Sequence, residues 1–341
     1  MRKVLNKRLS EEVIQDIEGP DNLHPVVGHM IKRLKEGSVR GKRTDGRTIA
    51  LAVEGGGFRG TVSGGMCLIL ESAGLIDAID IIYGTSSGAL NGAFTAAGQA
   101  ALGSTNYEDV ANRQFYNPFR LIGKRGVIDF DFLLNQIIRN RKPLDVTKFK
   151  SGPDFRAIAV NPKTQSVEIL KDFNNVDEIM QAIRVSCALP YLTGPPSKFR
   201  GVPMIDGGIL APIPYKQALE EGATDVLVLR SRPEFSRKKK RTPDAARKAI
   251  NRRQLKVISM LADSHRIYNE QAEELIELSN KHSSVYQIVP SGDMATIPTR
   301  ERNIEKIRAA MMLGARSAAH SFGMPEIDLV WHPVPYITKR V

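Results

Sequence analysis

The chain has 341 residues, a formal net charge of +12 and an apolar fraction of 42%. This composition is that of a globular protein, and it excludes a disordered, collagenous or coiled-coil chain. Without a run of about 18 apolar residues, no membrane-spanning helix is expected, and the N-terminal MRKVLNKR does not lead into an apolar signal sequence. Cys67 and Cys187 lie in apolar surroundings and are expected to be buried free thiols, which favours a cytoplasmic protein and leaves signal-less secretion open.

The predicted elements begin with a polar, helical leader over residues 1–47, where one helical face carries Val26, Val27, Met30, Ile31 and Leu34. Apolar strands then alternate with helices up to about residue 230. We expect strands at 48–53, 79–83, 155–160, 166–170 and 225–229, and helices at 61–72, 87–97, 176–186 and 215–221. This order predicts an α/β protein whose mostly parallel central sheet is covered by helices on both faces.

A basic segment, residues 231–256, follows the last of these strands. Between residues 230 and 256 the chain has twelve Lys or Arg and two acidic residues, a net charge of +10. Such a run is either a solvated, mobile surface or a site that binds an anionic membrane. No nucleic acid partner is expected, because no aromatic residues interleave with the charges.

The C-terminal residues, 257–341, are predicted to be a helical accessory region that packs on the preceding domain. Helices are expected at 254–280 and 300–320, with a short apolar stretch at 285–289 between them. The later helix carries an apolar stripe formed by Ile304, Ile307, Met311 and Ala315.

A glycine-rich turn, Glu54-Gly55-Gly56-Gly57-Phe58-Arg59-Gly60, follows the first strand and opens a helix. Its glycines match the G-x-G-x-x-G pattern of dinucleotide-binding folds. That pattern requires an acidic residue at the carboxyl end of the next strand, whereas Asp80 stands at the amino end. The backbone N–H groups of such a turn can instead stabilise an anion, including the oxyanion of an acyl-transfer reaction.

A second turn, Gly84-Thr85-Ser86-Ser87-Gly88, is a G-x-S-x-G sequence between a predicted strand and a predicted helix. In this context the central serine projects from a sharp turn at the helix N-terminus, which predicts Ser86 as a nucleophile. Gly84 and Gly88 would let strand and helix approach closely, and Ser87 is out of register. The alternative is a turn without chemistry.

Asp206 is the candidate general base, because it follows a short apolar run and precedes Gly207 and Gly208. Asp-Gly pairs are more often simple turns. The order Ser, Asp, His would also allow a triad, for which the later histidines are candidates: His265, His282, His320 and His332. The residues alone leave a dyad and a triad open.

These three sequences, in this order, resemble the patatin-like phospholipases. The stretch 182–190 and the pair Pro195-Pro196 are also similar to the segment that precedes the aspartate in that family. The resemblance covers about residues 48–230, and the C-terminal third is a weaker match to a bacterial subgroup.

The resemblance implies a three-layer α/β/α patatin-like fold and a Ser86–Asp206 dyad that needs no cofactor and no metal. The oxyanion hole would be formed by the glycine-rich turn, through Gly55, Gly56, Gly57, Arg59 and Gly60. Four further glycines would support the elbow and the aspartate: Gly84, Gly88, Gly207 and Gly208. Glu54 departs from the family, in which many members have Asp, and little consequence is expected.

The resemblance therefore predicts a lipid acyl hydrolase, of the phospholipase A or lysophospholipase type, that acts on membrane lipids or fatty-acyl esters through an acyl-enzyme. Residues 48–230 would be its catalytic domain. Two alternatives stay open: a non-lipid carboxylesterase or thioesterase with the same dyad, and a catalytically silent lipid-binding module.

Overall fold

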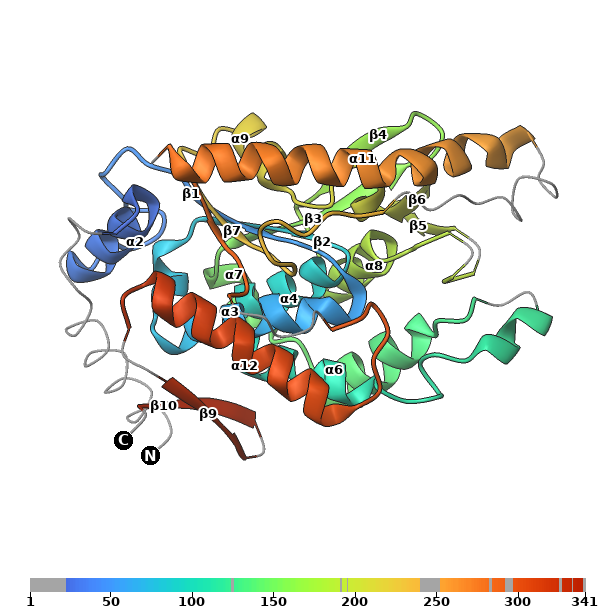
Figure 1. Cartoon of the computed structure of the whole chain (residues 1–341), viewed down its shortest axis with the longest axis horizontal. Helices are drawn as coiled ribbons and strands as arrows, with labels where there is room; N and C mark the ends of the chain where they lie inside the picture. Colours follow the sequence, from blue (N-terminus) through green and yellow to red (C-terminus); the bar gives the residue numbers. More distant parts are fainter. Residues whose placement is uncertain are drawn as a thin grey trace.

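The core of the protein is an eight-stranded, mostly parallel sheet, seen in a computed structural model (Figure 1). The structure describes residues 23–123, 126–190, 192–194, 196–239, 252–281, 284–291, 297–324, 327–332 and 334–339. Its strands are β1 (Ile49–Val53), β2 (Ile81–Thr85), β3 (Asp154–Asn161), β4 (Ser166–Leu170), β5 (Ser197–Phe199), β6 (Val202–Asp206), β7 (Asp225–Leu229) and β8 (Val285–Ile288). The order is β5-β6-β3-β2-β1-β7-β8, with β4 paired to β3. Strands β1, β2, β3, β7 and β8 are parallel, whereas β4 and β6 run antiparallel to β3.

Helices cover both faces of this sheet, as expected. They are α2 (Pro25–Lys35), α3 (Gly60–Ser72), α4 (Ser87–Ala96), α5 (Ala100–Ser104), α6 (Asn106–Asp109), α7 (Val146–Ser151), α8 (Val176–Ser186), α9 (Tyr215–Glu220), α11 (Arg252–Asn280) and α12 (Ile304–Ser321). Shorter 3₁₀ turns occur at Gly57–Arg59, Leu75–Ala78, Pro118–Gly123 and Gly207–Ile209, and Phe132–Arg141 is a π-helix. In Figure 1, α11 runs along one face of the sheet, and α3, α4 and α12 lie on the other.

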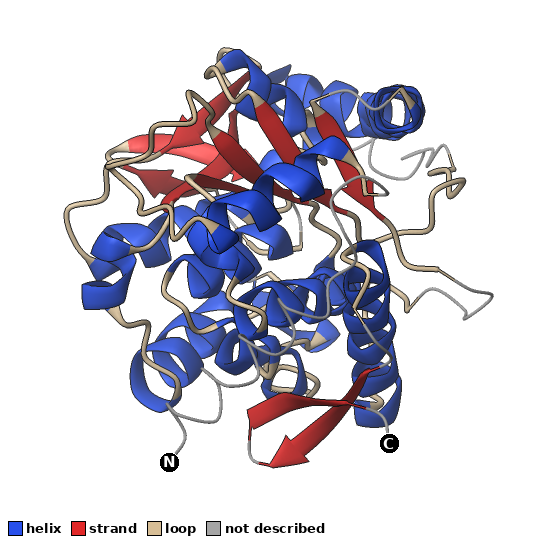
Figure 2. Cartoon of the chain, turned by 90° about the vertical axis from the view of Figure 1, so that its left-hand side faces the viewer, coloured by secondary structure: helices blue, strands red, loops and turns tan. Residues whose placement is uncertain are grey.

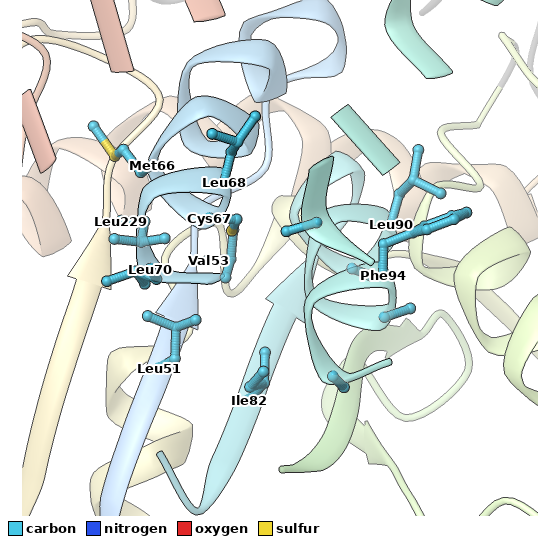
Figure 3. Close-up of a cluster of buried hydrophobic side chains, with 14 of the residues drawn as sticks. Leu51, Val53, Met66, Cys67, Leu68, Leu70, Ile82, Leu90, Phe94 and Leu229 are labelled. Atoms are coloured by element: carbon cyan, nitrogen blue, oxygen red, sulfur yellow. The ribbon is translucent and has the colours of Figure 1, made fainter. Parts of the chain in front are cut away.

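The strands are buried on both faces, which explains their continuous apolar sequences. Leu51 and Val53 of β1 pack with Leu229 against α3 and α4 (Figure 3). The intervening Ala50 and Ala52 face α9 and α11. Because every residue of β1 and β7 is buried, the polar groups that do chemistry can stand only at the ends of these strands.

The C-terminal residues contribute strands as well as helices. β8 extends the main sheet beside β7, and α12 packs against α3. β9 (Ile327–His332) and β10 (Val334–Lys339) form a separate antiparallel hairpin, which lies apart from the main sheet in Figure 2. The predicted helix at 300–320 begins four residues late, at Ile304, where the Asn303 side chain accepts a hydrogen bond from the Lys306 amide at 3.1 Å.

The residues that argued against a dinucleotide site are placed as expected. Asp80 precedes β2 at the amino edge of the sheet, where its carboxylate accepts hydrogen bonds from Arg33 at 2.7 Å and Arg43 at 2.6 Å. Cys67 and Cys187 are buried and free. Within the described parts of the chain, no helix combines the length and apolar character needed to span a bilayer.

Candidate active site

Strand register brings Ser86 and Asp206 together, although 120 residues separate them. β2 pairs with β3 as far as Thr85, which lies opposite Ile158. β6 then pairs with β3 in the antiparallel sense and places Asp206 opposite Ala159. Since β4 occupies the other edge of β3 at this point, β6 continues the edge where β2 ends. The carboxyl ends of β2 and β6 therefore meet.

Ser86 has a strained backbone, with φ 56° and ψ −127°, at the sharp turn between β2 and α4. A non-glycine residue in this region costs about 1–3 kcal/mol and is found mostly at functional sites. The turn is held by the Ser86 amide, which donates to Ser186 Oγ at 2.9 Å, and by the Ser86 carbonyl, which accepts from the Ala89 amide at 2.8 Å. The serine side chain is thereby presented at the start of α4.

The glycines of the elbow are required by close backbone contacts. A Cβ on Gly88 would stand 2.2 Å from the Val53 carbonyl oxygen, and one on Gly84 would stand 2.5 Å from the Gly88 oxygen. A Cβ on Gly207 would stand 2.3 Å from the Ile158 oxygen, whereas the space at Gly208 is less restricted. The first three glycines thus allow the strand ends and α4 to pack as closely as they do.

Ser86 Oγ donates a hydrogen bond to Asp206 Oδ2 at 2.9 Å, and the other carboxyl oxygen accepts from the Gly208 amide at 2.7 Å. Asp206 is 6% exposed. Burial raises the pKa of its carboxyl to about 6, while the hydrogen bonds from Gly208 and Ser86 and the charge of Lys238 act in the opposite direction. A carboxylate in this environment is a stronger base than an exposed one.

The glycine-rich turn lies against this pair. A Cβ on Gly55 would be 2.9 Å from Ser86 Cβ. The amide of Phe58 donates to the Thr299 carbonyl at 3.2 Å, and that of Arg59 to the Gly56 carbonyl at 3.3 Å.

The amides of Gly56 and Gly57 donate to no acceptor among the described residues, and both glycines line the cavity above Ser86, as do Gly55 and Arg59. Gly60 does not line it. A Cβ on Gly60 would lie 2.3 Å from Tyr107 Oη, so this glycine serves the packing of α3.

Glu54 has a larger structural role than the sequence indicated. Its buried Oε2 accepts a hydrogen bond from Arg230 Nε at 3.0 Å and from the Ser231 amide at 2.7 Å. Ser231 Oγ in turn donates to the Gly55 carbonyl at 2.8 Å. Arg230 also contacts Gln287 and is fully buried. These contacts connect the glycine-rich turn to the end of β7. The sequence contained only one sign of this connection, which is that a charged residue follows each of the strands β1 and β7.

A cavity of about 770 Å³ opens above Ser86 and Asp206. Its lining includes Ser86, Asp206 and many apolar side chains, among them Leu90, Val110, Phe115, Ile128, Phe130, Leu133, Leu189 and Leu192. Basic side chains also face it: Arg59, Arg232, Lys238, Arg300 and Arg302. A long apolar group attached to a carbonyl at Ser86 would find apolar surroundings here.

The basic segment is only partly a surface feature. Arg230, which directly precedes the segment, is buried, and Arg232 and Lys238 are half-buried and line the cavity, so these cations are not part of a fully exposed face. Arg237 pairs with Glu273 on α11 at 3.2 Å. Residues 240–251 of the segment lie outside the described residues.

No histidine side chain that the structure describes lines the cavity. His29 pairs with Asp225 at 2.7 Å, at the amino edge of the sheet and opposite the site. The other described histidines are also elsewhere, on α11 for His265, near the end of α12 for His320 and against Tyr286 for His24. His282 and the His332 side chain lie outside the described part of the chain. Nor does that part contain a cluster of side chains able to hold a metal ion.

The family model for patatin-like phospholipases matches residues 51–219, which include the whole glycine-rich turn, the elbow and Asp206. Residues 51–219 are a patatin-like phospholipase domain. Its α/β architecture, a mostly parallel sheet between helices, is the one expected from the sequence. The curated protein YjjU of Escherichia coli (strain K12) is 28% identical over 190 residues, which cover 54% of this chain and 52% of YjjU. The chain thus spans about half the length of that relative.

Two solved structures resemble the chain more distantly. VipD from Legionella pneumophila is 14% identical, and the match covers 81% of this chain and 66% of VipD with a TM-score of 0.41. Human GIVD cytosolic phospholipase A2, solved with methyl gamma-linolenyl fluorophosphonate, is 9% identical, and the match covers 92% of this chain and 62% of that chain with a TM-score of 0.42.

Proposed function

We propose that the protein is a lipid acyl hydrolase of the phospholipase A or lysophospholipase type, with Ser86 as nucleophile and Asp206 as general base. The observation that carries this proposal is the 2.9 Å hydrogen bond from Ser86 Oγ to Asp206 Oδ2, at a cavity with many apolar side chains. The patatin-like domain and the strained backbone of Ser86 support it. The apolar lining favours a fatty-acyl chain as the group bound next to the reacting carbonyl.

In the first half-reaction, Asp206 would accept the hydroxyl proton of Ser86 as Oγ attacks the ester carbonyl carbon. The carbonyl oxygen becomes an oxyanion, stabilised by the amides of Gly56 and Gly57 with the Arg59 charge nearby. When the tetrahedral intermediate collapses, the carbon–oxygen bond to the alcohol breaks and the proton on Asp206 passes to the leaving alcohol. An acyl-enzyme on Ser86 remains.

In the second half-reaction, water would attack the acyl-enzyme and give its proton to Asp206. The carbon–oxygen bond to Ser86 then breaks, the proton returns to Oγ, and the fatty acid leaves. Burial raises the pKa of Asp206 to about 6, so the gap between the pKa of the base and that of the serine hydroxyl is smaller than it would be for an exposed aspartate. Proton transfer in both halves depends on this value.

We also propose that residues 48–230 form the catalytic unit and that residues 257–341 form an accessory region, which supplies β8, α12 and most of α11 to the packing around it. Lys and Arg of the basic segment that remain exposed would attract an anionic membrane surface, each contributing about 1 kcal/mol. The two buried free cysteines support a reducing compartment such as the cytoplasm. Vesicle binding that does not weaken with salt would contradict the membrane role.

A fluorophosphonate probe tests the hydrolase. We expect covalent labelling of the wild type, none of Ser86→Ala, and unchanged labelling of the control Ser87→Ala if that variant folds. Asp206→Asn should lose most hydrolysis of phospholipid, whereas substitution of each histidine should not. Covalent labelling of the Ser86→Ala variant would refute the assignment of Ser86 as the nucleophile. Faster turnover of short-chain esters or acyl thioesters than of phospholipid would favour the non-lipid esterase, and no labelling of the wild type would favour a silent lipid-binding module.

A further inference from the structure

The cavity has two walls of different chemistry, contributed by different parts of the sheet. Segments that follow β2 and α8 supply the apolar side chains, whereas the segment that follows β7 supplies Arg232 and Lys238. In the sheet order, β2 and β7 flank β1, whose end carries the glycine-rich turn. A carbonyl held at Ser86 therefore has an apolar wall on one side and the basic wall formed by Arg232 and Lys238 on the other. Arg300 and Arg302, which also line the cavity, contact Tyr116 at the rim of the apolar wall.

Arg232 and Lys238 are held in place by α11. Lys238 Nζ lies 4.4 Å from the centre of the Tyr268 ring, and the Arg232 guanidinium lies 5.4 Å from it. The Asn269 side chain fixes the Lys238 backbone, since it accepts from the amide at 2.8 Å and donates to the carbonyl at 3.1 Å. Cations stacked on a buried aromatic ring lose little freedom when they bind an anion.

Neither cation has a carboxylate partner within ion-pair distance among the residues that the structure describes. Their neighbour Arg230 differs, because Glu54 neutralises it. The Asp206 carboxyl interacts electrostatically with Lys238, but it forms no ion pair with it, and both of its oxygens already accept hydrogen bonds. Burial, followed by the charge of Arg232, lowers the pKa of Lys238 to about 8. The basic wall thus carries positive charge that an anion would stabilise.

An ester has an acyl arm and an alcohol arm on either side of its carbonyl carbon, and the two walls of the cavity suit different arms. The acyl arm is apolar and matches the wall formed by residues such as Leu133 and Leu192. The alcohol arm then points toward the cations. We propose that Arg232 and Lys238 bind an anionic group, such as a phosphate, on the alcohol arm, so that the substrates are fatty-acyl esters of a negatively charged alcohol. This assignment rests on the proposed hydrolase function.

Binding to the Ser86→Ala protein tests the anion site without turnover. Calorimetric titration would compare dodecyl phosphate, dodecanol and inorganic phosphate. We expect dodecyl phosphate to bind at least about 10-fold more tightly than either of the others, because only it uses both walls, and we expect Lys238→Met or Arg232→Gln to weaken it about 10-fold or more. Lys238→Arg keeps the charge and should retain most of the binding.

The matched control is Lys150→Met, which removes an exposed charge from α7, ahead of β3 at the opposite edge of the sheet. It should leave the binding of dodecyl phosphate unchanged. Equal binding of dodecyl phosphate and dodecanol, or an effect of Lys150→Met as large as that of Lys238→Met, would overturn the site. Inorganic phosphate that binds as tightly as dodecyl phosphate would mean a site for a free anion, and would overturn the assignment to substrate.

Turnover gives a second readout that separates this inference from the proposed function. The two substrates are 1-acyl-glycerol 3-phosphate and the 1-monoacylglycerol with the same acyl chain, both below their micelle concentrations. The ratio of their kcat/KM values cancels any effect of Lys238 on Asp206, since both reactions use the same base. The wild type should prefer the phosphate ester, and Lys238→Met should lower the ratio about 10-fold or more.

Ser86-dependent turnover with an unchanged ratio in Lys238→Met would overturn the anion site and leave the hydrolase standing. Conversely, Lys238-dependent binding of dodecyl phosphate without turnover of either ester would refute the hydrolase and keep the anion site. The two failures therefore give different results.

Discussion

Replacing Asp206 by Asn is expected to stabilise the folded protein near neutral pH while it removes the proposed base. Burial raises the pKa of this carboxyl from its ordinary value of 3.8 to about 6, although hydrogen bonds from Gly208 and Ser86 partly offset the effect. An Asn side chain carries no charge to desolvate. Its oxygen can still accept from the Gly208 amide, and its NH₂ group can donate to Ser86 Oγ.

The magnitude follows from proton linkage at Asp206. The unfolded chain releases this proton near pH 3.8 and the native protein near pH 6, so the native state binds more protons between these values. The carboxyl therefore lowers the wild-type free energy of unfolding as pH rises through this window. At about 1.36 kcal/mol for each pKa unit, the loss reaches about 3 kcal/mol above pH 6. Below about pH 4 the carboxyl is neutral in both states, and the advantage of Asn disappears.

Urea denaturation followed by circular dichroism at about pH 4 and about pH 8 measures this difference. Asp206→Asn should match the wild type at the lower pH and gain on the order of 3 kcal/mol at the higher pH. Asp263→Asn, at an exposed position on α11, is the control and should change little at either pH. A gain that does not depend on pH, or a less stable variant at pH 8, would refute the reasoning that burial governs this carboxyl.

Three further perturbations address the base, the glycine-rich turn and the packing of α12. For an uncharged ester, kcat/KM should rise with pH and level off above about 6, because Asp206 must be ionised to accept a proton. Glu54→Gln should lower the free energy of unfolding by about 3 kcal/mol or more in urea, since it leaves Arg230 buried without a counter-charge. Gly314→Ala should lower the melting temperature, because its Cβ would lie 1.9 Å from the Val62 carbonyl oxygen on α3.

Each of these three expectations has an outcome that would contradict it, and the last two have a matched control variant. A kcat/KM that stays flat from about pH 5 to about pH 8 would contradict the assignment of the base. Glu305→Gln removes an exposed carboxylate 4.0 Å from Arg308, and the Glu54 prediction fails if both variants lose the same stability. Gly64→Ala on α3 places its Cβ 3.5 Å or more from its nearest neighbours, the side chains of Asn91 and Tyr107, so it should be tolerated, and an equal loss from both glycine variants would show that the contact of α12 with α3 is not the cause.

Much of the fold between residues 48 and 230 could be predicted because its elements are local patterns. Helix α8 and strand β7 have the bounds expected from the sequence, Val176–Ser186 and Asp225–Leu229. The side chain of Asn175 caps the former by accepting from the Glu178 amide at 3.0 Å, and the latter is an unbroken apolar run buried on both faces. Neither feature requires knowledge of a distant partner.

Features that depend on distant partners were not predicted. The stretch at 285–289 appeared only as an apolar segment, and its addition to the sheet depends on pairing with β7. The C-terminal region was predicted to be helical, yet the backbone of His332 belongs to β9, which is stabilised by its pairing with β10. The π-helix Phe132–Arg141 has no simple period that a 3.6-residue repeat would detect.

The candidate catalytic pair lies between these extremes. Ser86 could be found locally, since the strand, sharp turn and helix around it are all encoded by neighbouring residues. Asp206 could be named only as a candidate, because its position next to Ser86 depends on how β3 pairs with both β2 and β6. The residues left a triad open for that reason, and only the family resemblance favoured the aspartate.

The charge of the cavity could not be inferred from the sequence at all, because a run of cations does not show which of them are buried. Tyr268 of α11 draws Arg230, Arg232 and Lys238 inward, at 5.9, 5.4 and 4.4 Å from its ring centre. Glu54 forms an ion pair with Arg230, and its charge also acts on Lys238, so the positive charge left on this wall is that of Arg232 and Lys238. Glu54 therefore sets how much of the basic run acts on the cavity, although its own side chain is buried and its partner stands at the end of another strand. The choice of a glutamate before the glycines thus bears on the electrostatics of the site as well as on the position of the turn.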